Sequence, residues 1–498
     1  MTSKQLPRVA IVGGGLAGLA AAVRLVEQGI KVELFEARRR LGGRAGSFTP
    51  TSNSRSLTPD SRLLTTDHGQ HVSMGCCTAL ADLLDRTGLA DTFEAHRRMH
   101  FIGPDGRRRD LAAASWLPAP LHLLPSLLRF DWLSPGERWR IVRAVWSMKN
   151  MARSTNKAPL PVPGACAKAI EAANELSNNK TLSAACCPLP TDHDQSADTW
   201  LRSHGQSTQA IDQFWSPVLV SALSEMVDHA SLRLSRKVIM GSLLGTRRAY
   251  ELHIPRRPLV EIFDQRLGRW LESRGVTIHR LTRITRIEGN SQRAQAIVPS
   301  LPTARCLLPT ARCRLPIVHD AIILAVPWDR VAGLLSPELL AAMPEVQRLD
   351  EIRPAAITSV HLTYDRPITE LPHAMLVGRL GQWLFAKPDN RYQVVISASH
   401  RLVDCPRNEL VEQIKRELAE VFPEAAGARV LSHRVVVQPR AVFSASPGIE
   451  SLRPAQKTPI KNLALAGDWT ATGWPATMES AVRSGNAAAE VIAGQFRG

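Results

Sequence analysis

Tyrosine is almost missing from this chain of 498 residues: it occurs three times, and aromatic residues make up only 5% of the sequence. The arginines are dispersed, and the chain has no stripe of basic and aromatic residues of the kind that binds nucleic acid. We therefore expect no nucleic-acid partner, although the net charge is +17. An anionic membrane surface is the better match for this charge.

Long apolar runs and metal-binding motifs are also missing. No run reaches the roughly 18 apolar residues that a membrane-spanning helix needs, so we expect any membrane contact to be peripheral. The eight cysteines show none of the spacings typical of metal ligands, which predicts free thiols and no metal site. The N-terminus leads directly into a predicted strand and leaves no room for a signal peptide. We expect a cytoplasmic protein at the inner face of the cell membrane, with its thiols reduced.

The N-terminal segment carries the strongest motif. The apolar, β-branched run from Val9 to Val12 predicts a buried parallel strand, and a small-residue helix follows to about Gln28. A second strand from Lys31 to Phe35 ends at Glu36. Between the first strand and the helix lies a glycine-rich turn, Gly13-Gly14-Gly15-Leu16-Ala17-Gly18.

Each part of this motif has a physical task in binding a dinucleotide. Gly13 allows the tight turn, Gly15 lets backbone N–H groups approach a pyrophosphate, and Gly18 lets helix and strand pack closely. The helix N-terminus places partial positive charge at the phosphates. A carboxylate at Glu36 can accept hydrogen bonds from both ribose hydroxyls, which favours FAD or NAD over NADP.

A second anion site is predicted near the C-terminus. The strand from Leu463 ends in Gly467 and Asp468, and a helix rich in small residues follows. The Asp468 carboxylate can accept from a ribityl hydroxyl, while the helix N-terminus faces the pyrophosphate or the flavin O2 edge. The alternative is that Asp468 only caps this last helix.

Together the two ends resemble the FAD-dependent amine oxidase and phytoene desaturase superfamily. The resemblance rests on the glycine turn, Glu36, the Gly42-Gly43-Arg44 triplet and the Gly467-Asp468 pair. It implies FAD as the cofactor, and we expect the FAD to be bound non-covalently because no Cys or His lies in a context that indicates covalent attachment. The residues assigned to FAD are Gly13, Gly15, Leu16, Ala17, Gly18, Glu36, Ala37, Gly42, Gly43, Arg44, Gly467, Asp468, Pro475, Ala476 and Thr477.

Within that superfamily the sequence resembles the hydroxysqualene dehydroxylases, squalene-associated enzymes of hopanoid synthesis. The matching stretches are residues 67–71, 75–78, 117–129, 214–223 and 467–485. The resemblance implies that reduced FAD removes the hydroxyl of hydroxysqualene and gives squalene, with a hydrophobic C30 isoprenoid as the substrate. Loops at 50–64, 152–195 and 290–315 look like insertions relative to this pattern.

The expected fold is α/β, with a Rossmann-like FAD-binding domain of the amine-oxidase type and an inserted α+β substrate-binding domain. We assign residues 1–75, 255–330 and 435–498 to the FAD-binding domain, and 76–254 and 331–434 to the substrate-binding domain. The substrate domain is expected to carry apolar helices, some of which face the membrane. A Pro-broken apolar segment at 116–132 is the predicted contact with the bilayer interface.

Candidate substrate and catalytic residues lie in this middle region. An apolar tunnel is predicted along residues 116–132 and 214–223, although ordinary core packing is the alternative for any single residue. Its candidate wall residues are Leu121, Leu124, Leu127, Phe214, Trp215, Leu219 and Trp474. The candidate proton donors are His68 and His71 beside Asp67, because histidine titrates near neutrality, with Glu225 and then Asp228 next in rank. The two histidines could instead only pack against the flavin or hold a turn.

Other functions stay open at this point. The chain could be a flavin desaturase of another polyprenoid or an amine oxidase, although an aromatic cage for an amine is hard to build from three tyrosines. A lipid binder that keeps FAD as a structural element is a third alternative. No second GxGxxG motif occurs, so the sequence indicates no separate NAD(P)H domain and leaves the external electron donor unknown.

Overall fold

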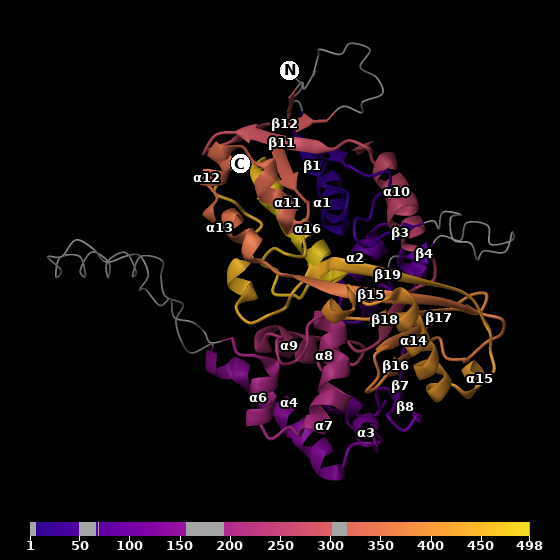
Figure 1. Ribbon diagram of the computed structural model, residues 1–498. Coiled ribbons are helices and arrows are strands. Elements are labelled where there is room, and N and C mark those ends of the chain that lie inside the picture. Colours follow the sequence, from indigo (N-terminus) through magenta and orange to yellow (C-terminus); the bar gives the residue numbers. More distant parts are fainter. Residues whose placement is uncertain (1–5, 49–65, 68, 156–193, 301–315, 498) are drawn as a thin grey trace.

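The computed structural model (Figure 1) describes residues 6–48, 66–67, 69–155, 194–300 and 316–497. Most of the predicted insertions, and His68, lie outside the described residues. Figure 1 shows a parallel sheet with its helices in the upper half and a larger sheet with a helical region in the lower half.

The upper half is built on a five-stranded parallel sheet, and the predicted strand–helix–strand unit at the N-terminus forms its centre. The strand order is β10-β2-β1-β14-β20. Strands buried on both faces read as continuous apolar runs, as these do. The strand bounds are Arg8–Val12 (β1), Lys31–Phe35 (β2), Thr277–His279 (β10), Ala321–Leu324 (β14) and Leu463–Leu465 (β20).

Two long helices from opposite ends of the chain pack against each other beside this sheet. They are α1 (Leu16–Val26) and α16 (Met478–Gly494). The approach is close because Gly485 has no side chain: a Cβ there would lie 2.1 Å from the Ala17 carbonyl oxygen. The short helix α2 (Thr78–Arg86) packs on the other side of α16, so three segments far apart in sequence share one core.

A small antiparallel sheet and several short helices complete the upper half. The alternating pattern of residues 276–288 predicts two strands that pair with each other. Instead, β10 joins the parallel sheet and β11 pairs with β12. Alternation shows which side chains share a face of a strand, but it does not identify the neighbouring strand. The bounds are Ile284–Gly289 (β11), Ala294–Pro299 (β12), Ile317–Val318 (β13), Val260–Arg266 (η5), Leu267–Ser273 (α10), Trp328–Val331 (α11), Ala332–Leu334 (η6), Pro337–Ala341 (α12), Pro344–Gln347 (α13), Arg348–Glu351 (η7) and Ile449–Leu452 (η9).

The lower half contains a seven-stranded sheet of order β19-β15-β18-β17-β16-β7-β8. Helices α14 and α15 pack on it through a separate apolar cluster. Strands β7 and β8 pair antiparallel at one edge of this sheet. The bounds are Met99–Ile102 (β7), Arg108–Leu111 (β8), Pro354–Tyr364 (β15), His373–Leu376 (β16), Trp383–Lys387 (β17), Arg391–Ile396 (β18), Val430–Phe443 (β19), His400–Leu402 (η8), Arg407–Val421 (α14) and Pro423–Ala426 (α15).

A helical region lies beside the seven-stranded sheet in the lower half of Figure 1, to its left. Serine side chains at Ser196, Ser207 and Ser231 cap three of its helices by accepting a backbone N–H in the first turn. The bounds are Leu121–Leu123 (η2), Leu124–Leu127 (α3), Pro135–Thr155 (α4), Ala197–Ser203 (α6), Thr208–Ala210 (α7), Ile211–Trp215 (η3), Ser216–Leu223 (α8), Leu232–Val238 (α9) and Ile239–Leu243 (η4). The two halves are joined by short strands and one turn of helix: Ser47–Phe48 (β3), Thr66–Asp67 (β4), Ser73–Met74 (β5), Phe93–His96 (β6), Leu252–Pro255 (β9) and Ala90–Thr92 (η1).

The chain crosses between the halves more often than the expected domain limits suggest. Helix α2 falls in the range assigned to the substrate domain, yet it shares the core of α1 and α16. Strand β19 runs past residue 435, yet it pairs along its length with β15 of the lower sheet. In the described part of the chain, no helix combines the length and apolar character needed to cross a membrane.

Candidate active site

One large cavity lies at the carboxyl ends of the parallel strands, where ligands bind in doubly wound folds. It has a volume of about 890 Å³, near the upper end of the roughly 300–1,000 Å³ usual for ligand pockets. Residues directly after β1, β14 and β20 line it, and its wall continues onto α8, α9 and the seven-stranded sheet. Both halves of the molecule therefore contribute to one space.

The three glycines with assigned tasks in the N-terminal turn, Gly13, Gly15 and Gly18, have two kinds of surroundings. A Cβ on Gly13, which has a φ of +113°, would lie 2.3 Å from the Ala325 carbonyl oxygen, and a Cβ on Gly18 would lie 2.0 Å from the Gly13 oxygen. At Gly15 the space is open, because a Cβ there would meet only Gly43 Cα at 3.9 Å. Packing thus requires glycine at Gly13 and Gly18, whereas the open space at Gly15 fits the approach of a bound group.

The Glu36 carboxylate is fixed at the end of β2 by two backbone groups. The Gly14 N–H donates to one oxygen at 2.8 Å and the Arg38 N–H to the other at 2.7 Å. Glu36 is buried and lines the cavity together with Ala37. Thr282 and Arg283 line the same cavity, and the Thr282 N–H donates to the Glu36 carbonyl at 2.9 Å. No motif in the sequence marked Thr282 or Arg283.

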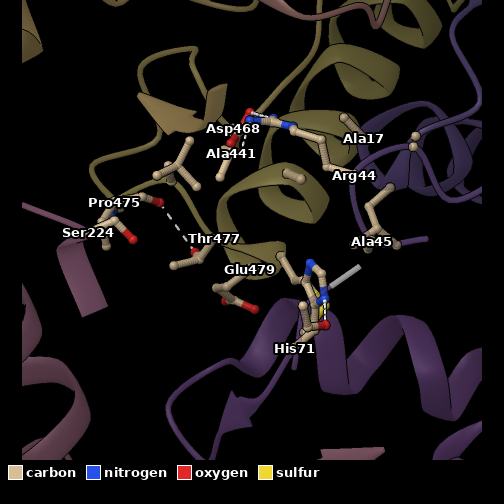
Figure 2. Close-up of a pocket in the computed structure, with 18 of the residues that line it drawn as sticks. Ala17, Arg44, Ala45, His71, Ser224, Ala441, Asp468, Pro475, Thr477 and Glu479 are labelled. Atoms are coloured by element: carbon tan, nitrogen blue, oxygen red, sulfur yellow. Dashed lines mark hydrogen bonds and ion pairs between the residues drawn. The ribbon is translucent and has the colours of Figure 1, made fainter. Parts of the chain in front are cut away.

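Arg44 and Asp468 join the two predicted anion sites. Their side chains form an ion pair, and Arg44 Nη1 also donates to the Ala441 carbonyl at 3.1 Å (Figure 2). Asp468 is buried. The last helix, α16, is capped by Thr477, whose hydroxyl accepts the Ser480 N–H at 3.2 Å. Asp468 is therefore not the helix cap, and its carboxylate faces the cavity with Arg44.

The remaining wall is apolar and comes from many elements. Trp383 is oriented by its indole N–H, which donates to Ser221 Oγ at 2.8 Å. The apolar lining residues of the lower half are Met99, Phe101, Leu111, Val218, Ala222, Leu243, Leu252, Met375, Trp383, Phe385 and Val395. This wall can hold a long hydrocarbon chain and keep water from it.

Comparison with known proteins agrees with this geometry. Residues 16–493 match the family model described as flavin containing amine oxidoreductase. The hydroxysqualene dehydroxylase of Sinorhizobium fredii is 27% identical over 97% of both chains. The zeta-carotene desaturase of Arabidopsis thaliana is 24% identical over 97% of this chain and 85% of its own. An oxidoreductase structure from Methanosarcina mazei superposes with a TM-score of 0.65 at 17% identity, over 98% of this chain and 100% of that one.

The chain belongs to the flavin-containing amine oxidoreductase family. A putrescine oxidase structure shares the fold, with a TM-score of 0.64 at 18% identity over 98% of this chain and 99% of the other. The predicted Rossmann-type α/β fold is confirmed, and the cofactor is FAD.

The cradle fits this cofactor. Helix α1 begins at Gly15 with no side-chain cap, so the N–H groups of its first turn are available to a phosphate. Of the predicted FAD residues, Gly18 alone lies off the cavity lining, because it packs against the Gly13 backbone. The others line the cavity, and their contacts with FAD stay predictions.

His71, a predicted proton donor, is poorly suited to that role in the folded protein. It lines the cavity, and its Nδ1 lies 2.9 Å from the Gly69 carbonyl oxygen, to which it donates. Burial lowers the pKa of His71, and the charge of Arg44 acts in the same direction against the opposing Asp67 carboxylate. The ring is therefore neutral at pH 7, and its Nε2 accepts rather than donates.

The carboxylate candidates do not face the cavity. Glu225 is buried and does not line it; the Ser444 hydroxyl and the Met226 N–H donate to its carboxylate, the latter at 3.2 Å. The Asp228 side chain is exposed beside His229. Glu225 and Asp228 thus have surroundings that suit structural roles.

Most of the residues predicted to form the substrate tunnel do not line the cavity. Trp474 lines the cavity, but Leu121, Leu124, Leu127, Phe214, Trp215 and Leu219 do not. Trp215 and Leu219 are fully buried in the core. On α8 the residues that face the cavity are Val218, Ser221 and Ala222, which lie within one turn. Because α8 is apolar on most sides, its sequence pattern does not show which side faces the cavity.

Two neighbouring thiols also face the cavity. Cys76 and Cys77 hydrogen-bond to each other, which raises the pKa of Cys76 and lowers that of Cys77. Both are free thiols, as is Cys405. Among the described residues, no group of histidine, cysteine and acidic side chains is arranged to hold a metal ion.

Proposed function

We propose that this flavoprotein removes the hydroxyl of hydroxysqualene and gives squalene. One observation carries the proposal: the FAD cradle and a long apolar wall form one continuous cavity of about 890 Å³. Relatives named hydroxysqualene dehydroxylase at 27% identity over 97% of the chain support this choice of substrate.

The cavity suits the chemistry of an allylic alcohol. FAD, when bound and reduced, supplies the hydride that replaces the hydroxyl. The residues of the wall exclude water from the allylic carbon once its C–O bond weakens. The aromatic rings of Phe101, Trp383 and Phe385 also line the cavity. An aromatic ring face stabilises positive charge on carbon by the same electrostatics as a cation–π contact.

An amine substrate fits this cavity less well. The three tyrosines are Tyr250, Tyr364 and Tyr392, and none of them lines the cavity. At the Trp474 wall, Lys237 and Arg483 lie against the indole ring, 4.7 and 5.0 Å from its centroid. These charges would repel an ammonium group, whereas they are compatible with an alcohol.

The substrate assignment is tested by product analysis. Purified holoenzyme, chemically reduced without oxygen, is incubated with hydroxysqualene and the extract is analysed by mass spectrometry. We expect squalene in proportion to reduced enzyme. A desaturase would leave hydroxysqualene unchanged and would instead oxidise a polyene when its flavin starts oxidised.

We also propose that the substrate enters from a membrane to which the protein docks peripherally. Large apolar side chains are exposed on the lower helical region: Trp116 (76% exposed), Trp139 (61%) and Trp146 (65%). Trp139 and Trp146 share one face of α4 with the exposed Arg140, Arg143 and Lys149. Tryptophan beside basic residues on one helix face is typical of helices that lie in the interface of anionic membranes.

A further inference from the structure

Removal of a hydroxyl requires a proton at the leaving oxygen, and the described cavity wall offers few donors. His71 is neutral and presents an acceptor, and Glu225 lies off the wall. The acidic lining residues are already engaged: Glu36 by backbone N–H groups, Asp468 by Arg44, Asp329 by Arg440 at 3.3 Å, and Glu479 by Arg483 and two backbone N–H groups. Arginine cannot give up its proton near neutral pH.

Lys237 differs from all of these. It lies in the last turn of α9, half-buried, and lines the cavity. Its ammonium group lies 4.7 Å from the centroid of the Trp474 ring. Within the part of the chain that the structure describes, no acceptor or carboxylate is hydrogen-bonded to or paired with Lys237 Nζ. A ring face holds a cation without consuming its N–H donors, so the three donors of Nζ stay available to a ligand.

Glu479 and Cys76 are the neighbours that favour the ammonium form of Lys237, but neither is hydrogen-bonded to or paired with its Nζ. Arg483 lies against the same ring, and its Nε donates to Glu479 at 2.7 Å. The Glu479 carboxylate also accepts hydrogen bonds from the N–H groups of Ala79 and Leu80 at 3.0 and 2.9 Å. Its oxygens are therefore occupied by the first turn of α2. Arg233, Arg236 and Glu450 line a small neighbouring pocket with Lys237, and Glu450 is paired with Arg453. Cys76 is the remaining titratable neighbour.

Burial lowers the pKa of Lys237, and Arg483 adds to this effect, whereas Cys76 and Glu479 oppose it more weakly. A lysine with a lowered pKa releases its proton more readily than an exposed one, as a general acid must. Lys237 is also placed near the cofactor cradle, because its partner Trp474 immediately precedes Pro475, Ala476 and Thr477, which line the same cavity.

We propose that Lys237 binds the substrate hydroxyl and donates the proton to it; this inference rests on the proposed function. In the step, the Nζ–H bond breaks and an O–H bond forms, and the C–O bond breaks with its electron pair moving to oxygen, so that water leaves. The allylic carbon receives a hydride from reduced FAD, which is thereby oxidised by two electrons. Lys237 is left as a neutral amine and regains its proton from solvent.

The test compares Lys237→Met and Lys237→Arg with a matched control, Lys415→Met, which removes a lysine on the outer helix α14. Reduced holoenzymes are mixed with hydroxysqualene without oxygen, and the single-turnover rate is followed from low to high pH. We expect Lys237→Met to lower the rate by about 100-fold or more, and Lys415→Met to leave it unchanged. Flavin content and the binding of squalene, measured by the change it causes in the oxidised flavin spectrum, should be equal in all variants.

The pH profile distinguishes proton donation from a structural role. The wild-type rate should fall as pH rises through the pKa of Lys237, because only the ammonium form donates, and Lys237→Met should lose this limb. Lys237→Arg keeps the charge and the contact with Trp474 but cannot donate, so it should bind hydroxysqualene and stay slow. A wild-type rate and pH profile in Lys237→Met would overturn the assignment of Lys237 alone. A wild-type enzyme that never reacts with hydroxysqualene would overturn both the assignment and the proposed function.

Discussion

The two ends of the cavity are built in opposite ways. At the cofactor end, short stretches of backbone shape the site: the turn from Gly13 to Gly18, the Gly42–Gly43 pair and the Gly467–Asp468 pair. At the substrate end, β7, β8, α8, α9, β16, β17 and β18 each contribute one to three side chains. Backbone shape tolerates little change in sequence, whereas a wall of scattered apolar side chains can be rebuilt for another hydrocarbon. The relatives named above, which include both a hydroxysqualene dehydroxylase and a zeta-carotene desaturase, fit this division.

The largest effect is expected at the cofactor end. Gly18→Ala would place a Cβ 2.0 Å from the Gly13 carbonyl oxygen, and neither backbone can yield without opening the turn. We expect loss of bound FAD and a clearly lowered melting temperature. The matched control is Gly427→Ala, where a Cβ meets nothing within 4 Å. A Gly18→Ala protein that keeps its flavin would show that the turn is more tolerant than this contact implies.

Glu36→Ala should weaken FAD binding without unfolding the protein. The carboxylate is held by two backbone N–H groups, and we expect it to accept from the ribose hydroxyls. Loss of such charge-assisted hydrogen bonds costs about 2–3 kcal/mol, or roughly 30–150-fold in affinity. Flavin retention on dilution measures this, with the exposed Glu272→Ala as the control. Unchanged retention would mean that Glu36 does not contact the ribose.

The substrate half should be the more sensitive to acid, because it contains a buried histidine cluster. His373 of β16 is fully buried against His96 and His100, and burial lowers the pKa of His373 to about 3. Below a pH of about 6.5, the unfolded chain binds a proton that the folded chain does not, so stability falls as pH falls towards 3. Between pH 6.5 and 5 this single group removes about 2 kcal/mol of unfolding free energy.

Urea unfolding of wild type and His373→Leu at both pH values checks this, with the exposed His400→Leu as the control. The expected result is a smaller loss on acidification in His373→Leu only. An equal loss in all three proteins would place the acid sensitivity elsewhere.

The smallest effect is expected at the membrane face. Trp139→Ser and Trp146→Ser should each lower binding to anionic liposomes several-fold, and added salt should lower it further. Val318→Ser is the control, since Val318 is 67% exposed but lies on β13 of the small upper sheet. Leu123 and Leu127 are unsuitable for this test, because they are buried and their loss would destabilise the fold. Equal binding of wild type and both tryptophan variants would exclude this face.

Sequence alone was sufficient where chemistry lies in consecutive residues. The turn from Gly13, Glu36 and the Gly467–Asp468 pair could be placed on elements, because their spacing is tied to backbone geometry. The wall residues could not be predicted: α8 is apolar on most sides, so the sequence does not show that Val218 and Ala222, rather than Trp215 and Leu219, face the cavity. Lys237 was missed because no motif surrounds it, and only the folded chain brings it to Trp474.

The most direct test of the proposed dehydroxylation is whether electrons pass from reduced flavin to hydroxysqualene. Reduced holoenzyme is mixed with hydroxysqualene in the absence of oxygen, and the absorbance of oxidised flavin is followed in time. We predict that this absorbance appears in one phase, with one squalene formed per flavin. We also predict that the flavin of the oxidised enzyme does not bleach when it is mixed with squalene or with a carotenoid precursor. Bleaching of the oxidised enzyme by a polyene, together with no response of the reduced enzyme to hydroxysqualene, would contradict the proposed dehydroxylation.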